Sequence, residues 1–342
     1  MKVAVLSGGG DAPGINAVIR AVVRKGIESY GFEMVGVENG WRGLIENEFT
    51  TLDLDETAGI LPRGGSILGT SRTNPFKNKG GAQKILRNAK ENGVDAVVVI
   101  GGEDTLGVAY KLYEMGLPCV GVPKTIDNDL LGTDYTFGFN TAVTIATDAL
   151  DRLHTTAESH QRVIILEVMG RYTGWIALEA GLAGGADAIL IPEKPFDLNE
   201  VSNLIKHRQS RGRNFSVIVV AEGAKPKEGK EILYSDSTDE FGHVRFGGVG
   251  YYLGKEIEKR IDTETRVVVL GHLQRGGSPT PFDRILATRF GIAAIDLVHQ
   301  GQFGRVVAIQ GNKIVSVPLK DIIGKRKTVD LNLYKTASVF FG

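Results

Sequence analysis

The sequence is short of cysteine, of net charge and of long apolar runs, and each shortage excludes a class of protein. Cys119 is the single cysteine in 342 residues, which rules out an internal disulfide and fits a reducing cytoplasm. Lysine plus arginine and aspartate plus glutamate number 40 each, so bulk charge favours neither nucleic acid nor an acidic membrane as partner. No stretch approaches a membrane span. The N-terminal MKVAVLSGGG is too short for a signal peptide, and we expect a cytoplasmic protein.

Apolar runs rich in valine and isoleucine alternate with helical patterns along the chain. The predicted strands are 2–7, 33–37, 95–100, 118–122, 163–168, 187–191, 215–221, 265–270 and 305–309. The predicted helices are 14–29, 80–92, 104–115, 138–158, 197–210, 247–261 and 281–298. Such alternation predicts an α/β fold with mostly parallel sheets covered by helices on both faces. The length of 342 residues suits two lobes of an enzyme.

Glycine-rich turns follow several predicted strands, and ligands of parallel sheets bind outside the carboxyl ends of strands. The first turn, SGGGDAPGIN (residues 7–16), lets backbone N–H groups approach an anion at a helix N-terminus. It has neither the G-x-G-x-x-G spacing nor the Gly-Lys-Ser/Thr of a P-loop. A plain tight turn, a phosphate site and a dinucleotide site that uses Glu38 for the ribose all stay open for this turn.

The second turn, VVVIGGEDTLG (residues 97–107), carries two adjacent acids, Glu103 and Asp104. Acids are ordinary residues in the first turn of a helix. A carboxylate at a strand end is also how kinases hold the magnesium ion that bridges phosphates. The turn by itself favours neither interpretation.

The third turn, residues 121–142, contains the dense polar run PKTIDND (residues 123–129). Lys124, Thr125, Asp127 and Asp129 follow an apolar strand within a few positions, and solvation of a loop accounts for only one or two of them. A carboxylate beside a hydroxyl nucleophile can accept its proton at an ordinary pKa if phosphoryl transfer is largely dissociative. The turn therefore predicts a phosphoryl-transfer site.

The motifs SGGGDAPGINA, GGEDT, PKTIDND, ESHQR, VMGRYTGW, VAEG and LGHLQRGGSPTPFDR occur in this order between about residues 2 and 310. In this combination the chain resembles the 6-phosphofructokinases. The resemblance implies two similar Rossmann-like lobes with the active site in the cleft between them. It also implies phosphorylation of fructose 6-phosphate at the 1-hydroxyl to give fructose 1,6-bisphosphate. We expect a larger donor-binding lobe, 1–137 plus 252–305, and a smaller sugar-binding lobe, 138–251 plus 306–342.

The resemblance further implies roles for individual residues of the three turns. Asp127 resembles the base that takes the proton from the sugar hydroxyl. Thr125 and Asp129 flank it and help to hold the transferring group and its Mg²⁺. Glu103 stands where the family usually has a metal-linked aspartate, and Gly10 resembles the glycine whose N–H meets the transferring phosphate.

Arginines and sugar-binding residues are carried over in the same way. Arg72 and Arg171 are similar to arginines that neutralise the transferring phosphoryl group, and the arginine fork suits phosphate oxygens. The sugar-phosphate pocket, besides Thr125, Asp127 and Arg171, is implied to contain Met169, Gly170, Glu222, His272 and Arg275. Arg162 and Arg266 match arginines that reach the 6-phosphate from a neighbouring subunit. A homodimer or homotetramer is therefore expected.

Asp104 and Lys124 bear on the phosphoryl donor. ATP users of the family typically have glycine at the position of Asp104, and many have glycine at that of Lys124. A carboxylate at Asp104 would repel the α-phosphate of a nucleotide, by roughly 4 kcal/mol at about 4 Å and an effective dielectric near 20. Pyrophosphate has no α-phosphate, and Lys124 would neutralise it. We therefore predict a reversible, pyrophosphate-dependent phosphofructokinase.

Several alternatives stay open at this point. The same family fold with Asp104 turned aside as a helix cap would use ATP. An NAD-dependent oxidoreductase would use the first turn, a nucleotide or lipid kinase would use the second, and a sugar-phosphate sensor would bind without catalysis. Related acceptors such as sedoheptulose 7-phosphate, and the choice between dimer and tetramer, are not decided by the sequence.

Overall fold

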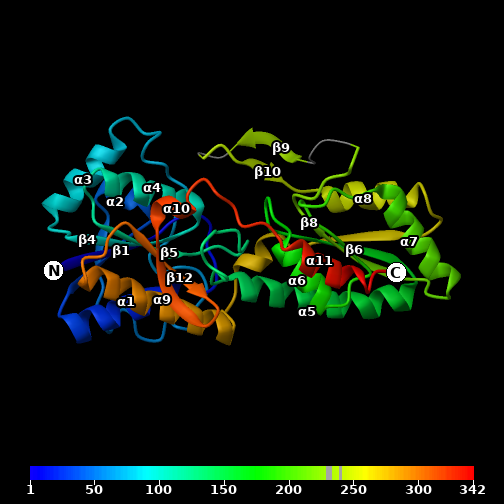
Figure 1. Ribbon diagram of the computed structural model, residues 1–342, viewed down its shortest axis with the longest axis horizontal. Coiled ribbons are helices and arrows are strands. Elements are labelled where there is room, and N and C mark those ends of the chain that lie inside the picture. Colours follow the sequence, from blue (N-terminus) through cyan, green and yellow to red (C-terminus); the bar gives the residue numbers. More distant parts are fainter. Residues whose placement is uncertain (229–232, 239–240) are drawn as a thin grey trace. The chain divides into compact units, whose positions relative to one another are not determined.

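The computed structural model describes residues 1–228, 233–238 and 241–342 and divides into two compact units (Figure 1). The first unit comprises Met1–Asn140 and Arg275–Arg326, and the second comprises Thr141–Gln274 and Lys327–Gly342. Each unit has a β-sheet and a hydrophobic core of its own. The predicted α/β class with mostly parallel sheets is confirmed.

A seven-stranded sheet in the order β13-β12-β5-β4-β1-β2-β3 forms the centre of the first unit. Its strands are β1 (Lys2–Ser7), β2 (Glu33–Val37), β3 (Phe49–Thr51), β4 (Ala96–Gly101), β5 (Cys119–Pro123), β12 (Arg305–Gln310) and β13 (Lys313–Pro318). The five inner strands are parallel, and β3 and β13 close the two edges antiparallel. β1, β4 and β5 are neighbouring parallel strands, so their carboxyl ends lie side by side. The three predicted turns, which follow these strands, therefore meet there.

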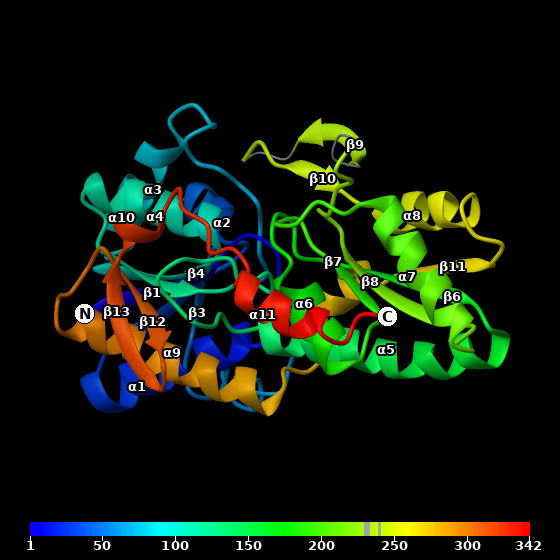
Figure 2. The ribbon, with the colours of Figure 1, turned by 45° about the vertical axis from the view of Figure 1, so that its right-hand side comes forward.

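Helices cover both faces of this sheet (Figures 1 and 2). They are α1 (Ile15–Tyr30), α2 (Trp41–Glu46), α3 (Gly81–Glu91), α4 (Glu103–Glu114), α9 (Pro281–His299) and the short α10 (Leu319–Ile322). α1 and α9 pack against one another on one face, and α2, α3, α4 and α10 lie on the other. A Cβ on Gly291 would stand 2.7 Å from Val18 O, so the glycine lets α1 and α9 approach closely.

The second unit contains a parallel four-stranded sheet in the order β11-β6-β8-β7. Its strands are β6 (Val163–Val168), β7 (Ala188–Leu190), β8 (Ser216–Ala221) and β11 (Thr265–Val269). Its helices are α5 (Phe139–His160), α6 (Trp175–Ala183), α7 (Leu198–Ser210), α8 (Val249–Glu258) and α11 (Leu331–Ser338), with a 3₁₀ turn at Gly271–Arg275. α7 and α8 lie on one face of the sheet, and α5, α6 and α11 lie on the other (Figures 1 and 2). A separate antiparallel pair is formed by β9 (Leu233–Thr238) and β10 (Val244–Phe246).

Every predicted strand and helix is present with ends close to those expected. The elements that the sequence did not predict are short, lie at sheet edges or lack a polar face. β3 has three residues, β13 is an edge strand, and α6 (WIALEAGLA) is apolar almost all round, so it shows no amphipathic stripe. No helix among the described residues is long and apolar enough to cross a membrane.

The boundaries of the units differ from the predicted lobes after residue 251. β11 pairs with β6 of the second unit, with Val267 opposite Ile165, although its residues were assigned to the first lobe. β12 pairs with β5 of the first unit, with Arg305 opposite Val120, although residues from 306 were assigned to the second lobe. The chain therefore passes from one unit to the other near residues 275 and 327. The first of the predicted lobe boundaries, at residue 138, lies close to the observed boundary after Asn140.

Candidate active site

The three glycine and polar turns of the first unit begin at neighbouring positions of the parallel sheet. Ser7 at the end of β1 pairs with Ile100, and Gly101 at the end of β4 pairs with Pro123. Two further backbone bonds continue this ladder into the turns, from Gly8 N–H to Ile100 O and from Lys124 N–H to Gly101 O, each 2.9 Å. The parallel register thus brings the starts of the three turns together.

Lys124 connects the third turn to the first. Its side chain is only 3% exposed, and its ammonium donates a hydrogen bond to Gly10 O. A Cβ on Gly9 would stand 3.4 Å from Lys124 Nζ. A Cβ on Gly10 would stand 2.6 Å from Arg275 Nη1, which also donates to Asp11 O at 3.1 Å. The glycines therefore let two cations lie directly against the backbone of the first turn.

The side chain of Lys124 has a pKa close to neutral pH. Burial lowers the pKa of Lys124 to about 7, and the positive charges of Arg275 and Arg72 act in the same direction. The negative charges of Asp11 and Asp127 act in the opposite direction. The ammonium and amine forms are therefore comparably populated at neutral pH, and a bound anion would favour the ammonium.

Arg72 lies near the first turn because the two residues before it, Thr70 and Ser71, are hydrogen-bonded to Gly9. Gly9 N–H donates to Ser71 O at 2.9 Å, and Thr70 Oγ1 donates to Gly9 O at 2.7 Å. Arg72 itself is exposed. The structure thus brings Gly10 and Lys124 into contact and places Arg72 within electrostatic reach of Lys124. It adds Arg275, which was assigned to the sugar pocket and here contacts the first turn.

The third turn holds Asp127 in a fixed backbone. Asp127 is 7% exposed, and its N–H donates to Thr125 Oγ1 at 3.1 Å. Asn128 has a left-handed φ of 52°, which asparagine tolerates better than most residues, and its Oδ1 accepts Thr136 N–H at 3.1 Å. Thr136 Oγ1 donates to Thr125 O at 2.7 Å. These bonds fix the backbone of the turn on both sides of Asp127, whose carboxylate lies within the electrostatic reach of Lys124.

The two adjacent acids are the first residues of α4. The N-cap position is taken by Gly102, and Glu103 and Asp104 follow it, half-buried, where the helix dipole favours negative charge. Asp104 therefore does not occupy the cap position that the ATP-dependent alternative gives it. Glu103 Oε1 accepts the Gly324 N–H at 2.9 Å, a contact that the sequence did not predict.

The side chains proposed as metal ligands, Glu103 and Asp129, have the chemistry that a phosphate-bridging magnesium ion needs. Within the described parts of the chain, no cluster of three or more His, Cys, Asp or Glu side chains is suited to hold a metal by itself. Magnesium in phosphoryl-transfer sites takes one or two protein carboxylates and completes its shell with phosphate oxygens and water. Glu103 and the half-buried Asp129 provide hard oxygen ligands of that kind.

Of the residues predicted for the sugar phosphate, Met169, Gly170, Arg171 and Glu222 lie in the second unit at the carboxyl ends of β6 and β8, whereas Thr125, Asp127 and Arg275 lie in the first unit. Glu222 Oε1 accepts Arg171 N–H at 2.9 Å, and Glu222 N–H donates to Val168 O at 2.8 Å. Gly170 has a φ of 146°, and a Cβ there would stand 2.5 Å from Thr173 O. The tight turn at Gly170 places Met169, Arg171 and Glu222 side by side.

A buried glutamine that the sequence analysis passed over completes this turn. Gln274 is 0% exposed, and its Oε1 accepts Met169 N–H at 2.8 Å. It lies in the 3₁₀ turn GHLQR together with the exposed His272. The only sequence signal for Gln274 is its place inside that motif.

Arg162 and Arg266 lie away from the other predicted sugar residues of the second unit. They stand at the amino ends of β6 and β11, next to Val163 and Thr265, which are paired. Both arginines form ion pairs with Glu264, another residue that the sequence did not single out. A six-residue strand spans roughly 20 Å, and β6, Val163–Val168, separates Arg162 from Met169. The structure therefore does not bring these arginines to the Met169–Glu222 group of the same chain.

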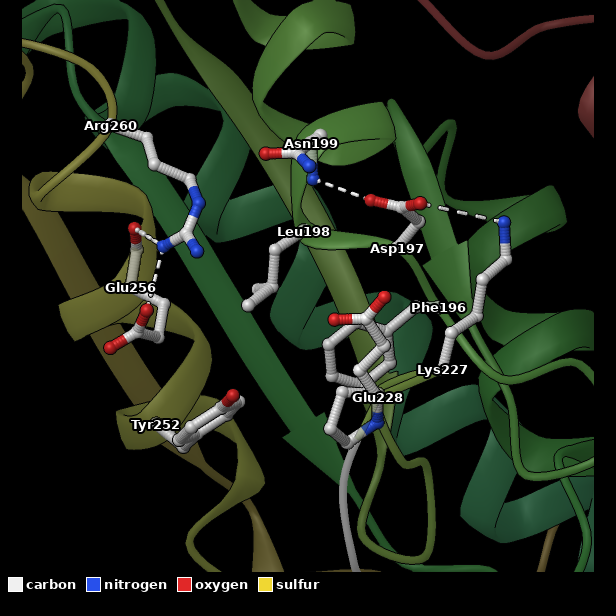
Figure 3. A pocket seen from close by; sticks show the side chains of 10 residues that line it. Phe196, Asp197, Leu198, Asn199, Lys227, Glu228, Tyr252, Glu256 and Arg260 are labelled. Carbon is white, nitrogen blue, oxygen red and sulfur yellow. Dashed lines mark hydrogen bonds and ion pairs between the residues drawn. The ribbon is translucent and has the colours of Figure 1, made fainter.

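The second unit also contains a cavity of about 270 Å³ between the start of α7 and α8 (Figure 3). None of the predicted site residues lines it. Four of its charged groups are paired: Asp197 lies 3.6 Å from Lys227 Nζ and also accepts Asn199 N–H at 2.8 Å, and Glu256 binds Arg260 at 2.6 Å. The cavity is therefore a hollow with paired charges outside the predicted site.

Comparisons with known proteins agree with this arrangement. The family model described as Phosphofructokinase matches residues 2–298. The chain is 58% identical over its full length to the pyrophosphate--fructose 6-phosphate 1-phosphotransferase of Streptomyces coelicolor, and 57% identical to that of Amycolatopsis methanolica, with all of each protein covered. It is also 53% identical, over the full length of both chains, to the ATP-dependent 6-phosphofructokinase of Mycobacterium bovis.

Solved structures show the same fold. Phosphofructokinase from Saccharomyces cerevisiae is 32% identical with a TM-score of 0.81, and the match covers 94% of this chain and 45% of that longer one. Pyrophosphate-dependent phosphofructokinase from Nitrosospira multiformis has a TM-score of 0.85 at 22% identity over 97% of this chain and 86% of that one, which bears on the fold alone. With its fold, its clustered turns and its full-length relatives taken together, this chain belongs to the phosphofructokinase family.

Proposed function

We propose that this chain transfers a phosphoryl group from pyrophosphate to the 1-hydroxyl of fructose 6-phosphate, reversibly. Full-length relatives named pyrophosphate--fructose 6-phosphate 1-phosphotransferase are 58% and 57% identical to this chain. An ATP-dependent relative is 53% identical. Overall identity therefore supports the reaction more strongly than the donor. The single observation that carries the donor is Asp104, a carboxylate in the first turn of α4 behind a glycine cap.

The first unit is proposed to bind the donor. Gly10 lies where backbone and cations meet, and Arg72, Lys124 and Arg275 supply positive charge around it. A nucleotide would bring a third phosphate toward Asp104, whereas pyrophosphate would not. The repulsion between two unit charges about 4 Å apart is roughly 4 kcal/mol at an effective dielectric near 20.

Glu103 and Asp129 would hold the magnesium ion of the site. When bound, the ion neutralises phosphate charge and orients the phosphoryl groups. The Gly324 N–H already holds the Glu103 carboxylate by a hydrogen bond at the N-terminus of α4. The proposed metal ligand Glu103 is therefore positioned by the chain before magnesium binds.

Asp127 is proposed to accept the proton of the sugar hydroxyl. Its backbone is fixed by Thr125, and Asn128 of the same turn is held by Thr136. Because the transferring group has metaphosphate-like character in the transition state, the base needs correct position more than a raised pKa. Arg171 is proposed to neutralise that group, together with Arg72.

The second unit is proposed to bind fructose 6-phosphate with Met169, Gly170 and Glu222, which share one tight turn, and with His272. Arg162 and Arg266 lie at the opposite end of β6. We therefore assign these two arginines to the 6-phosphate of a neighbouring subunit in a homodimer or homotetramer. The separation of the two groups within one chain supports this assignment.

A second candidate, the ATP-dependent reaction of the same family, is favoured by relatives of that name at 52% and 53% identity. The decisive experiment is a coupled assay of purified protein with Mg²⁺, fructose 6-phosphate and either donor. We expect kcat/KM for pyrophosphate to exceed that for ATP by about a hundredfold or more, as the repulsion at Asp104 implies. Equal values for the two donors would refute the donor assignment, and no turnover with either would refute the reaction.

Replacement of Asp104 tests the cause of donor choice. We expect Asp104→Gly to raise kcat/KM for ATP by about ten- to a hundredfold, with a further gain on adding Lys124→Gly, because charge and volume are both removed. Asp104→Asn removes the charge alone and separates the two effects. Glu114→Gln, at the far end of α4, is the matched control for net charge. Unchanged ATP use in the double variant would contradict the account.

Replacement of Asp127 tests the proposed base. Asp127→Asn keeps the shape of the side chain and leaves the backbone bond from residue 127 to Thr125 available. We expect turnover to fall by about 10²- to 10⁴-fold, as for the loss of a general base, while the equilibrium affinity for fructose 6-phosphate changes little. Turnover within twofold of wild type, with folded protein by circular dichroism, would remove Asp127 from the role.

The lowered pKa of Lys124 predicts proton uptake on donor binding. At pH 8 a group with a pKa of about 7 is mostly neutral. Pyrophosphate beside it would raise that pKa, so binding takes up close to one additional proton, and donor affinity falls as pH rises above 7. Calorimetry in buffers of different ionisation enthalpy measures the uptake. Lys124→Met corrects for protons taken up by pyrophosphate itself, and equal uptake in both proteins would contradict the prediction.

A further inference from the structure

The segment Gly324–Arg326 is attached at or next to both residues that are assigned to magnesium, Glu103 and Asp129. It follows α10, which packs against α4 (Figures 1 and 2). Gly324 N–H donates to Glu103 Oε1 at 2.9 Å. Arg326 forms an antiparallel bridge with Leu130, the residue directly after Asp129. One short stretch of backbone, far from both turns in sequence, is thereby attached to each of them.

The same segment is strongly basic. The sequence from residue 324 reads GKRK, and Lys325 and Arg326 are both exposed. Attachment at Gly324 on one side and at Arg326 on the other leaves Lys325 between the second and third turns. The backbone of Lys325 is thus held on the side of Glu103 and Asp129, whereas Lys124 and Arg275 lie on the side of Gly10.

The charge balance of the proposed donor site calls for such a cation. The second and third turns carry four carboxylates: Glu103, Asp104, Asp127 and Asp129. Lys124 is only partly protonated near neutral pH. Pyrophosphate brings several further negative charges in a small volume, and a divalent metal ion offsets only part of them. Additional positive charge near Glu103 and Asp129 would stabilise the bound donor.

We propose that the basic segment Gly324–Arg326 is part of the donor site, with Lys325 as a further residue that binds inorganic pyrophosphate. In this arrangement the Gly324 N–H positions the Glu103 carboxylate, and Lys325 contacts a phosphate oxygen through its ammonium. Lysine acts here as a mobile point charge, which suits a small anion with oxygens on all sides. The inference rests on the proposed function, because it assumes that the turns after β4 and β5 hold the donor.

The test replaces Lys325 by methionine and measures donor binding in two ways. A single charge-assisted contact accounts for about a tenfold effect. We expect Lys325→Met to raise both the Kd for pyrophosphate, measured by calorimetry without sugar, and the KM for pyrophosphate about tenfold. The KM for fructose 6-phosphate should stay within about twofold. The dependence of the Kd on salt concentration should also weaken, since one ionic contact is lost.

Lys320→Met is the matched control, because Lys320 is an exposed lysine of α10 a few residues before the segment. It removes the same charge and should leave the Kd and both KM values unchanged. A Kd for pyrophosphate within twofold of wild type in Lys325→Met, and in Lys325→Met combined with Arg326→Met, would overturn the inference. Such a result with normal pyrophosphate turnover would leave the proposed function intact, whereas absence of pyrophosphate turnover in the wild-type protein would refute that function first.

Discussion

The contact between the buried ammonium of Lys124 and the carbonyl of Gly10 is the interaction on which the first unit's site depends. It joins the turn after β5 to the turn after β1 across the strand that lies between them. A lysine so deeply buried is stabilised only by nearby acceptors and negative charge. Asp11 and Asp127 provide that charge, and the pKa of about 7 shows that they offset the desolvation only in part. The Lys124 ammonium itself therefore lacks part of the negative charge that would balance it, and a bound anion would supply that charge.

The glycines of the first turn have a clear physical role in this arrangement. Any side chain at Gly10 would meet the Arg275 guanidinium, and one at Gly9 would crowd Lys124. Without side chains, the backbone amides and two cations lie together in a small volume.

The two units divide the proposed work by the location of their strand ends. In the first unit the carboxyl ends of β1, β4 and β5 present cations and carboxylates, and in the second those of β6 and β8 present the Met169–Glu222 group. The first set has the chemistry of phosphate and metal binding, and the second the hydrogen-bonding groups suited to a sugar. Arg162 and Arg266 belong to neither set, because they lie at the amino ends of their strands and pair with Glu264.

The sequence by itself determined the strand–helix alternation, the α/β class and the residue types in each turn, because apolar periodicity and glycine punctuation are local properties. It also identified Lys124, Asp127 and the adjacent acids as candidates. Only the tertiary structure decided that β11 joins β6 and β12 joins β5, since strand pairing is a long-range contact that neither strand encodes alone. The same holds for Gln274 under Met169, for Glu264 between two arginines and for Gly324 at Glu103. Apart from the pairing of Glu264 with Arg266 two residues on, each of these contacts joins residues far apart in the chain, so no local pattern marks them.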